Sequence, residues 1–354
     1  MLESDPNVEG SPYVEDVTVD TVTIGIEAYA RRHAADLPPV RIERGRQLPI
    51  LGDLERFKAT LQAINQHFTV SSSANSVTAY AQEWLLDNYY IVQRSLLQLG
   101  DSLPRRYYYR LPKLSAGPYA GYPRIYALAR AFATYTEGQV EQQSAAAFLT
   151  SFQERIPLTT GELWAWPIML RLCALENLVW SLEQVSDLED FSALLDEGLR
   201  AQLRHDHPEP QLLVARSITG LRLLNTQDWP KFFESVSRVE GLLRRDPAGV
   251  YPLMDFETRD QYRGVVEKLA VRTALGEEQI AQAALQLARS APQDGQAATA
   301  SDAFSRPREA HVGYYLVDAG YPQLLHALQR DTWVDRLRQG FRGRALTASY
   351  IGAI

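Results

Sequence analysis

The sequence predicts an all-α protein, and three observations support this fold class. Apolar residues recur every three or four positions between 81 and 99, the spacing that places them on one face of a helix. A longer run after Pro157 opens with a helix-capping motif and is apolar on nearly every side. No segment alternates polar and apolar residues strongly enough to build a sheet, and no fixed-period repeat is present. We therefore expect a single multi-helix domain.

The N-terminal residues 1–50 are expected to form a flexible, poorly ordered arm. Residues 1–45 show no sustained period, although VEDVTVDTVTIGIEAY is compatible with a strand or hairpin. The helical domain spans 51–290 and begins with a helix at 53–68, which leads into the polar loop VSSSANS. The helix at 81–99 follows, and its apolar stripe comprises Trp84, Leu85, Tyr89, Val92, Leu96 and Leu99.

The helix after Pro157 is predicted to lie at the centre of the domain, because it is apolar all round. Thr159 and Glu162 form its capping box, in which each side chain satisfies an otherwise unpaired backbone N–H group. Pro167 is expected to kink the helix, since proline removes one backbone hydrogen bond. A bilayer span is not expected here, because three polar residues interrupt the run: Arg171, Glu176 and Asn177.

Further helices are expected on both sides of the central one. They lie at 123–135, 141–154, 187–203, 211–224, 229–244, 256–274 and 277–290. The helix at 256–274 starts at Asp255 or Thr258, and its predicted buried face comprises Val265, Val266, Leu269 and Val271. Residues 291–308 are interpreted as a flexible linker, and residues 309–344 as a C-terminal helical segment.

The last ten residues, 345–354, are predicted to begin a transmembrane helix. They carry no charge, and as a helix they would rise about 15 Å, roughly half of a bilayer core. Four arginines precede them, at Arg336, Arg338, Arg342 and Arg344. Arginines beside an apolar start are typical of the cytoplasmic edge of a membrane helix. The alternative is a frayed amphipathic tail.

Charge and composition narrow the class of protein. The net charge of −7 argues against a general nucleic-acid binder, so no nucleic-acid partner is expected. The acidic, polar N-terminus lacks the features of a signal peptide. Cys173 is the sole cysteine, which excludes an internal disulfide, and its apolar neighbours predict a buried, inert thiol. These features indicate the cytoplasm or the cytoplasmic face of a membrane.

The sequence contains no complete catalytic motif. It lacks phosphate-binding glycine loops, a G-x-S-x-G nucleophile motif, an Asp-x-Asp pair and a Gln-x-x-Arg-Trp motif. His205, Asp206 and His207 lack further ligands, so a solvated polar loop is a better interpretation than a metal site. Glu162 and Glu176 share a helix face but lie roughly 21 Å apart, too far for the roughly 5–9.5 Å of a glycosidase pair. No catalytic or metal-binding residue is assigned.

Residues 102–136 are unusual because they hold seven tyrosines and six basic residues but no Asp or Glu. Tyrosine faces stack on sugar rings, and arginines bind phosphates or carboxylates, so a recognition surface for glucan, sugar nucleotide or anionic head group is predicted. The candidates, with three residues of the central helix, are Arg106, Tyr107, Tyr108, Arg110, Lys113, Tyr122, Arg124, Tyr126, Trp164, Arg171 and Glu176. The alternative is that the tyrosines pack between helices and the arginines cap helices or pair with acids.

Several sequence blocks carry a family resemblance. They are EWLLDNYYIVQRSLLQL (83–99), LPRRYYYRLPKL (103–114), GPYAGYPRIYALARAFATYTEG (117–138), PLTTGELWAWPIMLRLCALENL (157–178), a block at 218–270 and HVGYYLVDAG (311–320). In this order they resemble the N-terminal region of cyclic β-1,2-glucan synthases. The resemblance covers most of residues 80–350, whereas residues 1–45 and 291–308 match poorly.

The resemblance implies an N-terminal module at the cytoplasmic face of the bacterial inner membrane. In the family, transmembrane helices, a glycosyltransferase module, a cyclising module and a phosphorylase-like glycosidase module follow this region. UDP-glucose and a divalent metal are implied for that larger protein, and no cofactor is implied for this chain. The implied partners are the other domains of the synthase, β-1,2-glucan, and the membrane through the C-terminus.

Three functions remain open at this point. The first is a non-catalytic module that supports or regulates the glycosyltransferase making β-1,2-glucan. The second is a stand-alone α-helical carbohydrate-active enzyme of the β-glucan glycosidase type, which requires two carboxylates facing each other in a cleft. The third is a general helical scaffold for protein interactions.

Overall fold

The computed structural model describes residues 25–42, 45–52, 54–70, 76–185, 195, 197–206, 209–291 and 307–329. For these residues the all-α prediction is confirmed, because helices make up nearly all of the regular structure. Two short strands are also present, β1 (Val40–Arg41) and β2 (Lys113–Leu114). They pair antiparallel with Val40 opposite Leu114, and this pairing fastens the N-terminal part of the chain to the tyrosine-rich stretch.

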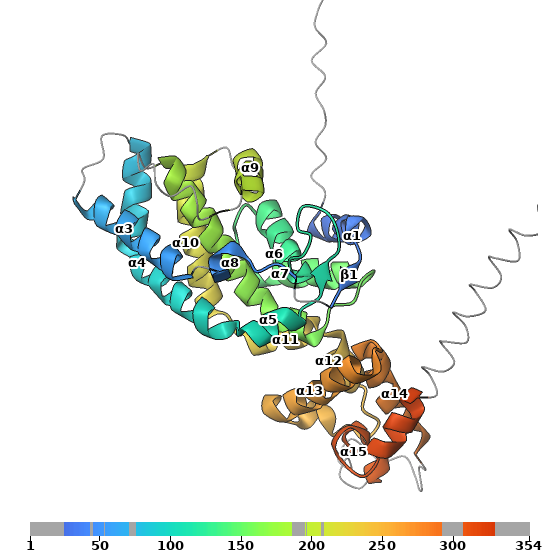
Figure 1. The fold of residues 1–354 in the computed structure, drawn as a ribbon. Coiled ribbons are helices and arrows are strands. Elements are labelled where there is room, and N and C mark those ends of the chain that lie inside the picture. Colours follow the sequence, from blue (N-terminus) through green and yellow to red (C-terminus); the bar gives the residue numbers. More distant parts are fainter. Residues whose placement is uncertain are drawn as a thin grey trace, which may run out of the picture.

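The helix α8 (Thr160–Val185) occupies the centre, as predicted. It packs against α4 (Ser76–Ser102), α6 (Arg124–Tyr135) and α10 (Pro210–Thr226), which surround it in Figure 1. Its side chains are buried on nearly every face, Cys173 among them. Pro167 lies inside α8 without ending it.

The N-terminal helix α1 (Ile26–Asp36) lies within the predicted arm but belongs to the folded body. It packs against α7 (Gln142–Gln153), and Ala30 and Ala34 are buried in that contact. Its periodicity is weak because small alanines, rather than large apolar residues, form the contact. The rest of the arm, residues 1–24, lies outside the described residues.

The remaining elements are α2 (Pro49–Gly52), α3 (Leu54–Val70), α5 (Arg105–Arg110), α9 (Glu197–Asp206), α11 (Trp229–Val236), α12 (Arg238–Leu243), α13 (Phe256–Thr273), α14 (Glu277–Ser290), α15 (Val312–Val317), and the 3₁₀ helices η2 (Tyr251–Leu253) and η4 (Arg308–Ala310). Some of these elements lie where helices were predicted, whereas α2, α5, η2 and η4 were not predicted. The helix predicted at 229–244 is divided at Ser237, whose hydroxyl accepts a hydrogen bond from the Glu240 amide at 3.2 Å. Such a cap starts a new helix.

Asp255 caps α13, as predicted, by accepting a hydrogen bond from the Thr258 amide at 2.8 Å. The predicted buried face of this helix was wrong at one position. Val266 and Leu269 are buried, whereas Val271 is 64% exposed. Successive helical residues are rotated by about 100°, so Val271 points away from the side on which Leu269 lies.

The hydrophobic core of the described residues forms two clusters. The larger one collects buried residues between Ala30 and Val236, and the smaller one collects those between Val239 and Leu328. Helices α12, α13, α14 and α15 surround the smaller cluster, and they form the orange and red group in Figure 1. Part of the predicted C-terminal segment thus returns to pack on the smaller cluster, where residues 321–329 are helical.

Within the part of the chain that the structure describes, no helix combines the length and apolar character needed to cross a bilayer. The transmembrane start predicted at 345–354 and the linker residues 292–306 lie outside the described residues.

Candidate functional site

The stretch without acids folds into α5, β2 and α6, and most of its predicted site residues are buried. Arg106 and Arg110 on α5 are exposed, and neither forms an ion pair within the described ranges. Tyr107 is half-buried. The remaining candidates from this stretch are at most 6% exposed: Tyr108, Lys113, Tyr122, Arg124 and Tyr126.

Arg124 anchors α6 to the start of α8. Its Nε and Nη2 atoms donate to the two carboxylate oxygens of Glu162 at 2.8 and 2.6 Å. The predicted capping box is confirmed: the Glu162 amide donates to the Thr159 hydroxyl at 3.2 Å, and the Thr159 amide donates to the Glu162 carboxylate at 3.0 Å. Glu162 therefore takes part in both the helix cap and an ion pair. Its pair with Arg124 is bidentate, which is the stronger geometry for an arginine–carboxylate interaction.

The first turn of α8 also joins the two hydrophobic clusters. Glu277, at the start of α14, accepts hydrogen bonds from the Thr160 amide at 2.8 Å and the Thr160 hydroxyl at 2.6 Å. The Tyr107 hydroxyl donates to the Gly161 carbonyl at 2.5 Å, on the same turn. Burial raises the pKa of Glu277 to about 7, while the hydrogen bonds from Thr160 act in the opposite direction.

Tyr126 and Glu176 meet in a buried polar network between α6 and α8. The Tyr126 hydroxyl lies 2.9 and 3.1 Å from the two Glu176 oxygens. Arg130 places its Nη1 atom 2.9 Å from the Asn177 Oδ1 atom and 3.3 Å from Glu176. Burial raises the pKa of Glu176 to about 7, and the charge of Arg130 and the bond from Tyr126 offset part of that effect.

Sequence reasoning did not identify Arg130 as a network residue. Its side chain is 1% exposed, and its Nε and Nη2 atoms have no partner within the described residues. The cost of burying a guanidinium is large, so the partners it does have, Glu176, Asn177 and the Cys173 carbonyl, fix its position. The helical spacing of Tyr126 and Arg130, four residues apart, could have indicated that they share a face.

Lys113 and Tyr108 stabilise the turn between α5 and β2. The Lys113 ammonium donates to the carbonyls of Tyr108 and Leu111 at 2.6 and 2.7 Å. Its Nζ atom lies 4.7 Å from the centre of the Tyr108 ring, and Arg46 lies at the same distance over the Tyr122 ring. These contacts are cation–π pairs that hold the loop.

The two remaining candidates on α8 contact neighbouring helices. Trp164 is half-buried and stacks on Phe233, with ring centres 4.6 Å apart. Arg171 donates to the Asn225 side chain at 3.2 Å. Burial lowers the pKa of Arg171 to about 10, and the nearby Arg94 acts in the same direction.

A shallow groove of about 210 Å³ lies beside the exposed arginines. Arg105, Tyr108 and Tyr109 line one side of it. Four leucines from α2, α3, α4 and the loop after α4 also line it, together with Gln47, Gly100 and Pro104: Leu51, Leu54, Leu99 and Leu103. Of the residues predicted to form a recognition surface, Arg106 and Arg110 on α5 are thus the ones that remain exposed, and this groove lies beside that helix.

For the described residues, no group of His, Cys, Asp and Glu is suited to hold a metal ion. His205 is exposed, and the Asp206 carboxylate accepts a hydrogen bond from the Thr134 hydroxyl at 3.2 Å. His207 lies outside the described residues.

Comparison with known proteins adds one finding. The chain is similar to a cyclic β-1,2-glucan synthase. Over 301 aligned residues it is 29% identical to the cyclic beta-(1,2)-glucan synthase NdvB of Rhizobium meliloti (strain 1021). The match covers 67% of this chain and 10% of that protein, so the chain corresponds to a small part of its synthase relative. The family resemblance predicted above is confirmed to this extent. No protein-family profile matches the chain.

Sequence reasoning also missed a second charged cluster, beside the smaller core. Arg263 is fully buried and donates to Glu240 at 2.6 Å, while Arg259 binds Glu234 at 2.9 Å through its Nε atom. The Arg263 guanidinium also lies about 5 Å from the rings of Phe233 and Phe256. These residues fall in the block at 218–270, whose resemblance to glucan synthases was the available signal.

Proposed function

We propose that the chain is a helical module of a cyclic β-1,2-glucan synthase, and that it supports or regulates the membrane glycosyltransferase without catalysing sugar transfer itself. The observation that carries this proposal is the match of 301 residues to a synthase of which the chain spans a tenth. The transferase that uses UDP-glucose and a divalent metal then lies elsewhere in the larger protein.

The engagement of the buried carboxylates supports a non-catalytic role. Glu162 is held by Arg124 and its own capping box, Glu176 by Tyr126, and Glu240 by Arg263. A glycosidase needs two carboxylates facing each other across an open cleft. A carboxylate that is closed in by such partners has no room for a sugar oxygen or an attacking water.

The exposed face of α5 is the docking surface in this proposal. Arg106 and Arg110 stand in solvent without acidic partners within the described ranges, on the same short helix as Arg105, which lines a groove of mixed polar and apolar character. Exposed arginines next to apolar side chains favour acidic, partly apolar protein surfaces. The partner is another domain of the synthase, at the cytoplasmic face of the bacterial inner membrane, with β-1,2-glucan as a further ligand of the assembly.

Co-purification tests the docking surface. The purified chain is mixed with detergent-solubilised glucan synthase that lacks the matching segment, and the amount retained is measured. We expect the wild-type chain to be retained and the Arg106→Glu/Arg110→Glu variant to be lost. The control is Arg272→Glu/Arg289→Glu, which reverses two exposed arginines of α13 and α14. Equal retention of both variants contradicts the assignment to α5.

A turnover assay separates the module from an enzyme. The isolated chain is incubated with UDP-glucose and with linear β-1,2-gluco-oligosaccharides, and products are separated by chromatography. We expect no product from either. Hydrolysis of the oligosaccharides would support a stand-alone glycosidase instead.

A further inference from the structure

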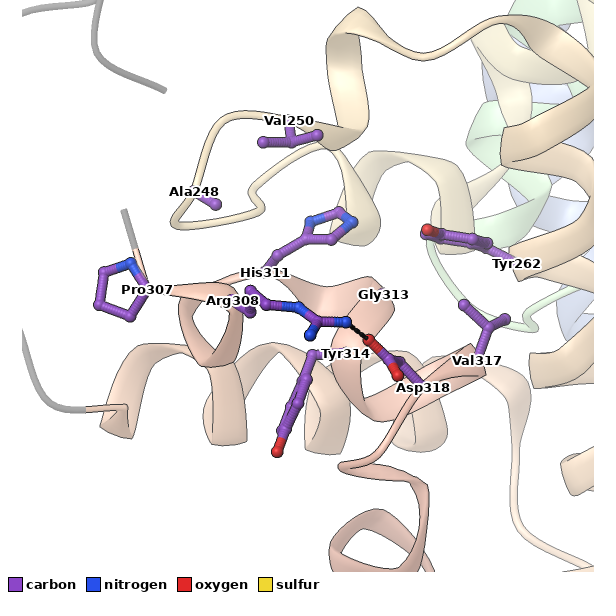
Figure 2. A pocket seen from close by; sticks show the side chains of 10 residues that line it. All are labelled: Ala248, Val250, Tyr262, Pro307, Arg308, His311, Gly313, Tyr314, Val317 and Asp318. Carbon is purple, nitrogen blue, oxygen red and sulfur yellow. Dashed lines mark hydrogen bonds and ion pairs between the residues drawn. The ribbon is translucent and has the colours of Figure 1, made fainter. Parts of the chain in front are cut away.

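A cavity of about 230 Å³ opens into the smaller core cluster, far along the chain from α5. Figure 2 shows the residues around it, which come from the loop after α12, from α13 and from the segment containing η4 and α15. Sites for drug-sized ligands begin at roughly 300 Å³, so this cavity suits a single small ring.

Asp246 fixes the orientation of His311 at the cavity wall. Its carboxylate accepts hydrogen bonds from the amides of Val250, Tyr251 and Val312 at 3.0 to 3.1 Å, and it contacts the His311 Nδ1 atom at 2.8 Å. Because the carboxylate is an acceptor, the Nδ1 atom carries the proton. The opposite atom of the ring, Nε2, is then the one available to a ligand.

Two polar atoms meet in this cavity without a partner within the described residues. In that part of the chain, the buried His311 Nε2 atom has no hydrogen bond, and none is formed by the Tyr262 hydroxyl. Figure 2 shows the two side chains pointing toward each other. A Cβ atom placed on Gly313 would lie 2.5 Å from each of them, so they lie within 5 Å of one another across the glycine. A buried ring nitrogen without a partner is unusual, and here it lies close to a free hydroxyl, so the two atoms are placed to hydrogen-bond one ligand together.

The remaining wall favours a neutral ligand. Arg308 is paired with Asp318 at 2.5 Å, so its charge is already compensated. Tyr314 and two valines, Val250 and Val317, add aromatic and apolar surface. Such walls suit the C–H faces of a sugar ring, and the two polar atoms suit its hydroxyls: Nε2 as an acceptor, the Tyr262 hydroxyl as a donor or acceptor.

We propose that this cavity binds one neutral hexose unit, with sugar hydroxyls bridging His311 and Tyr262 over Gly313. The choice of a glucose unit rests on the proposed function, whereas the class of a neutral, hydroxylated ring rests on the cavity itself. The site is separate from the α5 surface, so the chain can dock on the synthase whether or not a sugar is bound.

The test is an NMR titration of the full chain that follows the histidine ring signals. The probes are D-glucose and the β-1,2-linked disaccharide sophorose, and the His311 signal is assigned with His311→Gln. We expect either sugar at millimolar concentration to shift the His311 signal but not those of the exposed His67 and His205. No shift of His311 with either sugar overturns the proposal.

Two variants test the geometry. Gly313→Ala places a methyl group between the two polar atoms, and we expect it to weaken binding at least about tenfold. Tyr262→Phe removes one hydroxyl, and we expect about fivefold weaker binding. Tyr90→Phe, at an exposed tyrosine of α4, is the matched control and should bind as wild type. Unchanged affinity in both cavity variants contradicts the site.

Inorganic phosphate tests the charge preference. Shifts of His311 with phosphate at lower concentration than with glucose would contradict a neutral ligand. This inference and the proposed function fail separately. Loss of sugar binding with intact co-purification removes only the hexose site, whereas sugar binding without co-purification removes only the docking role.

Discussion

Two buried carboxylates, one in each core cluster, differ in the number of donors that surround them. Glu176 in the larger cluster is 1% exposed and has Tyr126 and Arg130 as side-chain partners. Asp246 in the smaller cluster is 6% exposed and has three backbone amides and His311. Burial raises the pKa of Glu176 to about 7. Burial also favours the neutral form of Asp246, but the hydrogen bonds from His311 and the backbone amides outweigh it and lower the pKa.

The comparison shows that the donors around a buried acid, more than burial itself, decide its charge. Backbone amides cannot move away, so Asp246 holds the loop after α12 and the start of α15 together as a carboxylate. Glu176 faces few donors and can take up a proton near neutral pH. Glu176 in the larger cluster therefore changes charge near neutral pH, whereas Asp246 in the smaller cluster stays ionised there.

The largest expected effect is that of Asp246→Ala. It leaves three backbone amides and the His311 ring without an acceptor, and we expect a loss of about 3–5 kcal/mol in the free energy of unfolding. Residues 239–329 contain no tryptophan. Urea unfolding followed by circular dichroism should therefore show an early transition that tryptophan fluorescence does not. A coincident, unshifted transition contradicts the role given to Asp246.

The pH dependence of Glu176 comes next. A glutamate in the unfolded chain has its ordinary pKa of 4.5, whereas the pKa of Glu176 in the folded state is about 7, so the folded state binds the proton more tightly. Stability then falls as pH rises from about 4.5 to 7, by about 3 kcal/mol, and levels off above that. Glu176→Gln should abolish the part of this pH-dependent loss of stability that Glu176 causes. Unfolding followed by tryptophan fluorescence at several pH values measures it. An unchanged slope in the variant contradicts the raised pKa.

Removing the positive charge of Arg130 provides a second test of the pKa of Glu176. Arg130→Met leaves Glu176 with the Tyr126 hydroxyl alone, and we expect a loss of about 2 kcal/mol at pH 8. At pH 6 the loss should be about 1 kcal/mol or less, because Glu176 is then protonated in both proteins. The double variant with Glu176→Gln serves as the control, since its loss should not depend on pH. Equal losses of the single variant at both pH values would contradict this account.

The smallest effects come from a matched pair of hydroxyl deletions. Tyr126→Phe removes a donor to a buried acid and should cost about 1–2 kcal/mol at pH 8. Tyr262→Phe removes a hydroxyl that has no partner within the described residues, and its stability should lie within about 0.5 kcal/mol of wild type. Denaturant midpoints at one pH measure both. A larger loss of stability in Tyr262→Phe than in Tyr126→Phe would contradict the assignment of the hydrogen-bonded hydroxyl to Tyr126.

Much of the helical framework could be predicted from the sequence, because local signals specify it. The capping box at Thr159, the Asp255 cap and the apolar run of α8 are short-range patterns that need no knowledge of the partner. The burial of α1 could not be predicted, since alanines carry little periodicity. The break at Ser237 was missed because one hydroxyl cap ends an otherwise continuous pattern.

The candidate site was harder to predict. The composition of residues 102–136 marked this segment as unusual, but the burial of its side chains depends on acids far along the chain, such as Glu162 for Arg124 and Glu176 for Tyr126. The cavity at His311 joins residues 65 positions apart in sequence, Asp246 and His311, and no local pattern links them. Only the tertiary structure brings such pairs together.

The central claim, that this module serves a glucan-making transferase, is tested most directly by restoring activity. Membranes that carry a cyclic β-1,2-glucan synthase without the matching segment are supplied with labelled UDP-glucose, with and without the purified chain. We predict that incorporation of label into β-1,2-glucan rises when the wild-type chain is added and does not rise with Arg106→Glu/Arg110→Glu. Incorporation that is the same with and without the wild-type chain would contradict the claim.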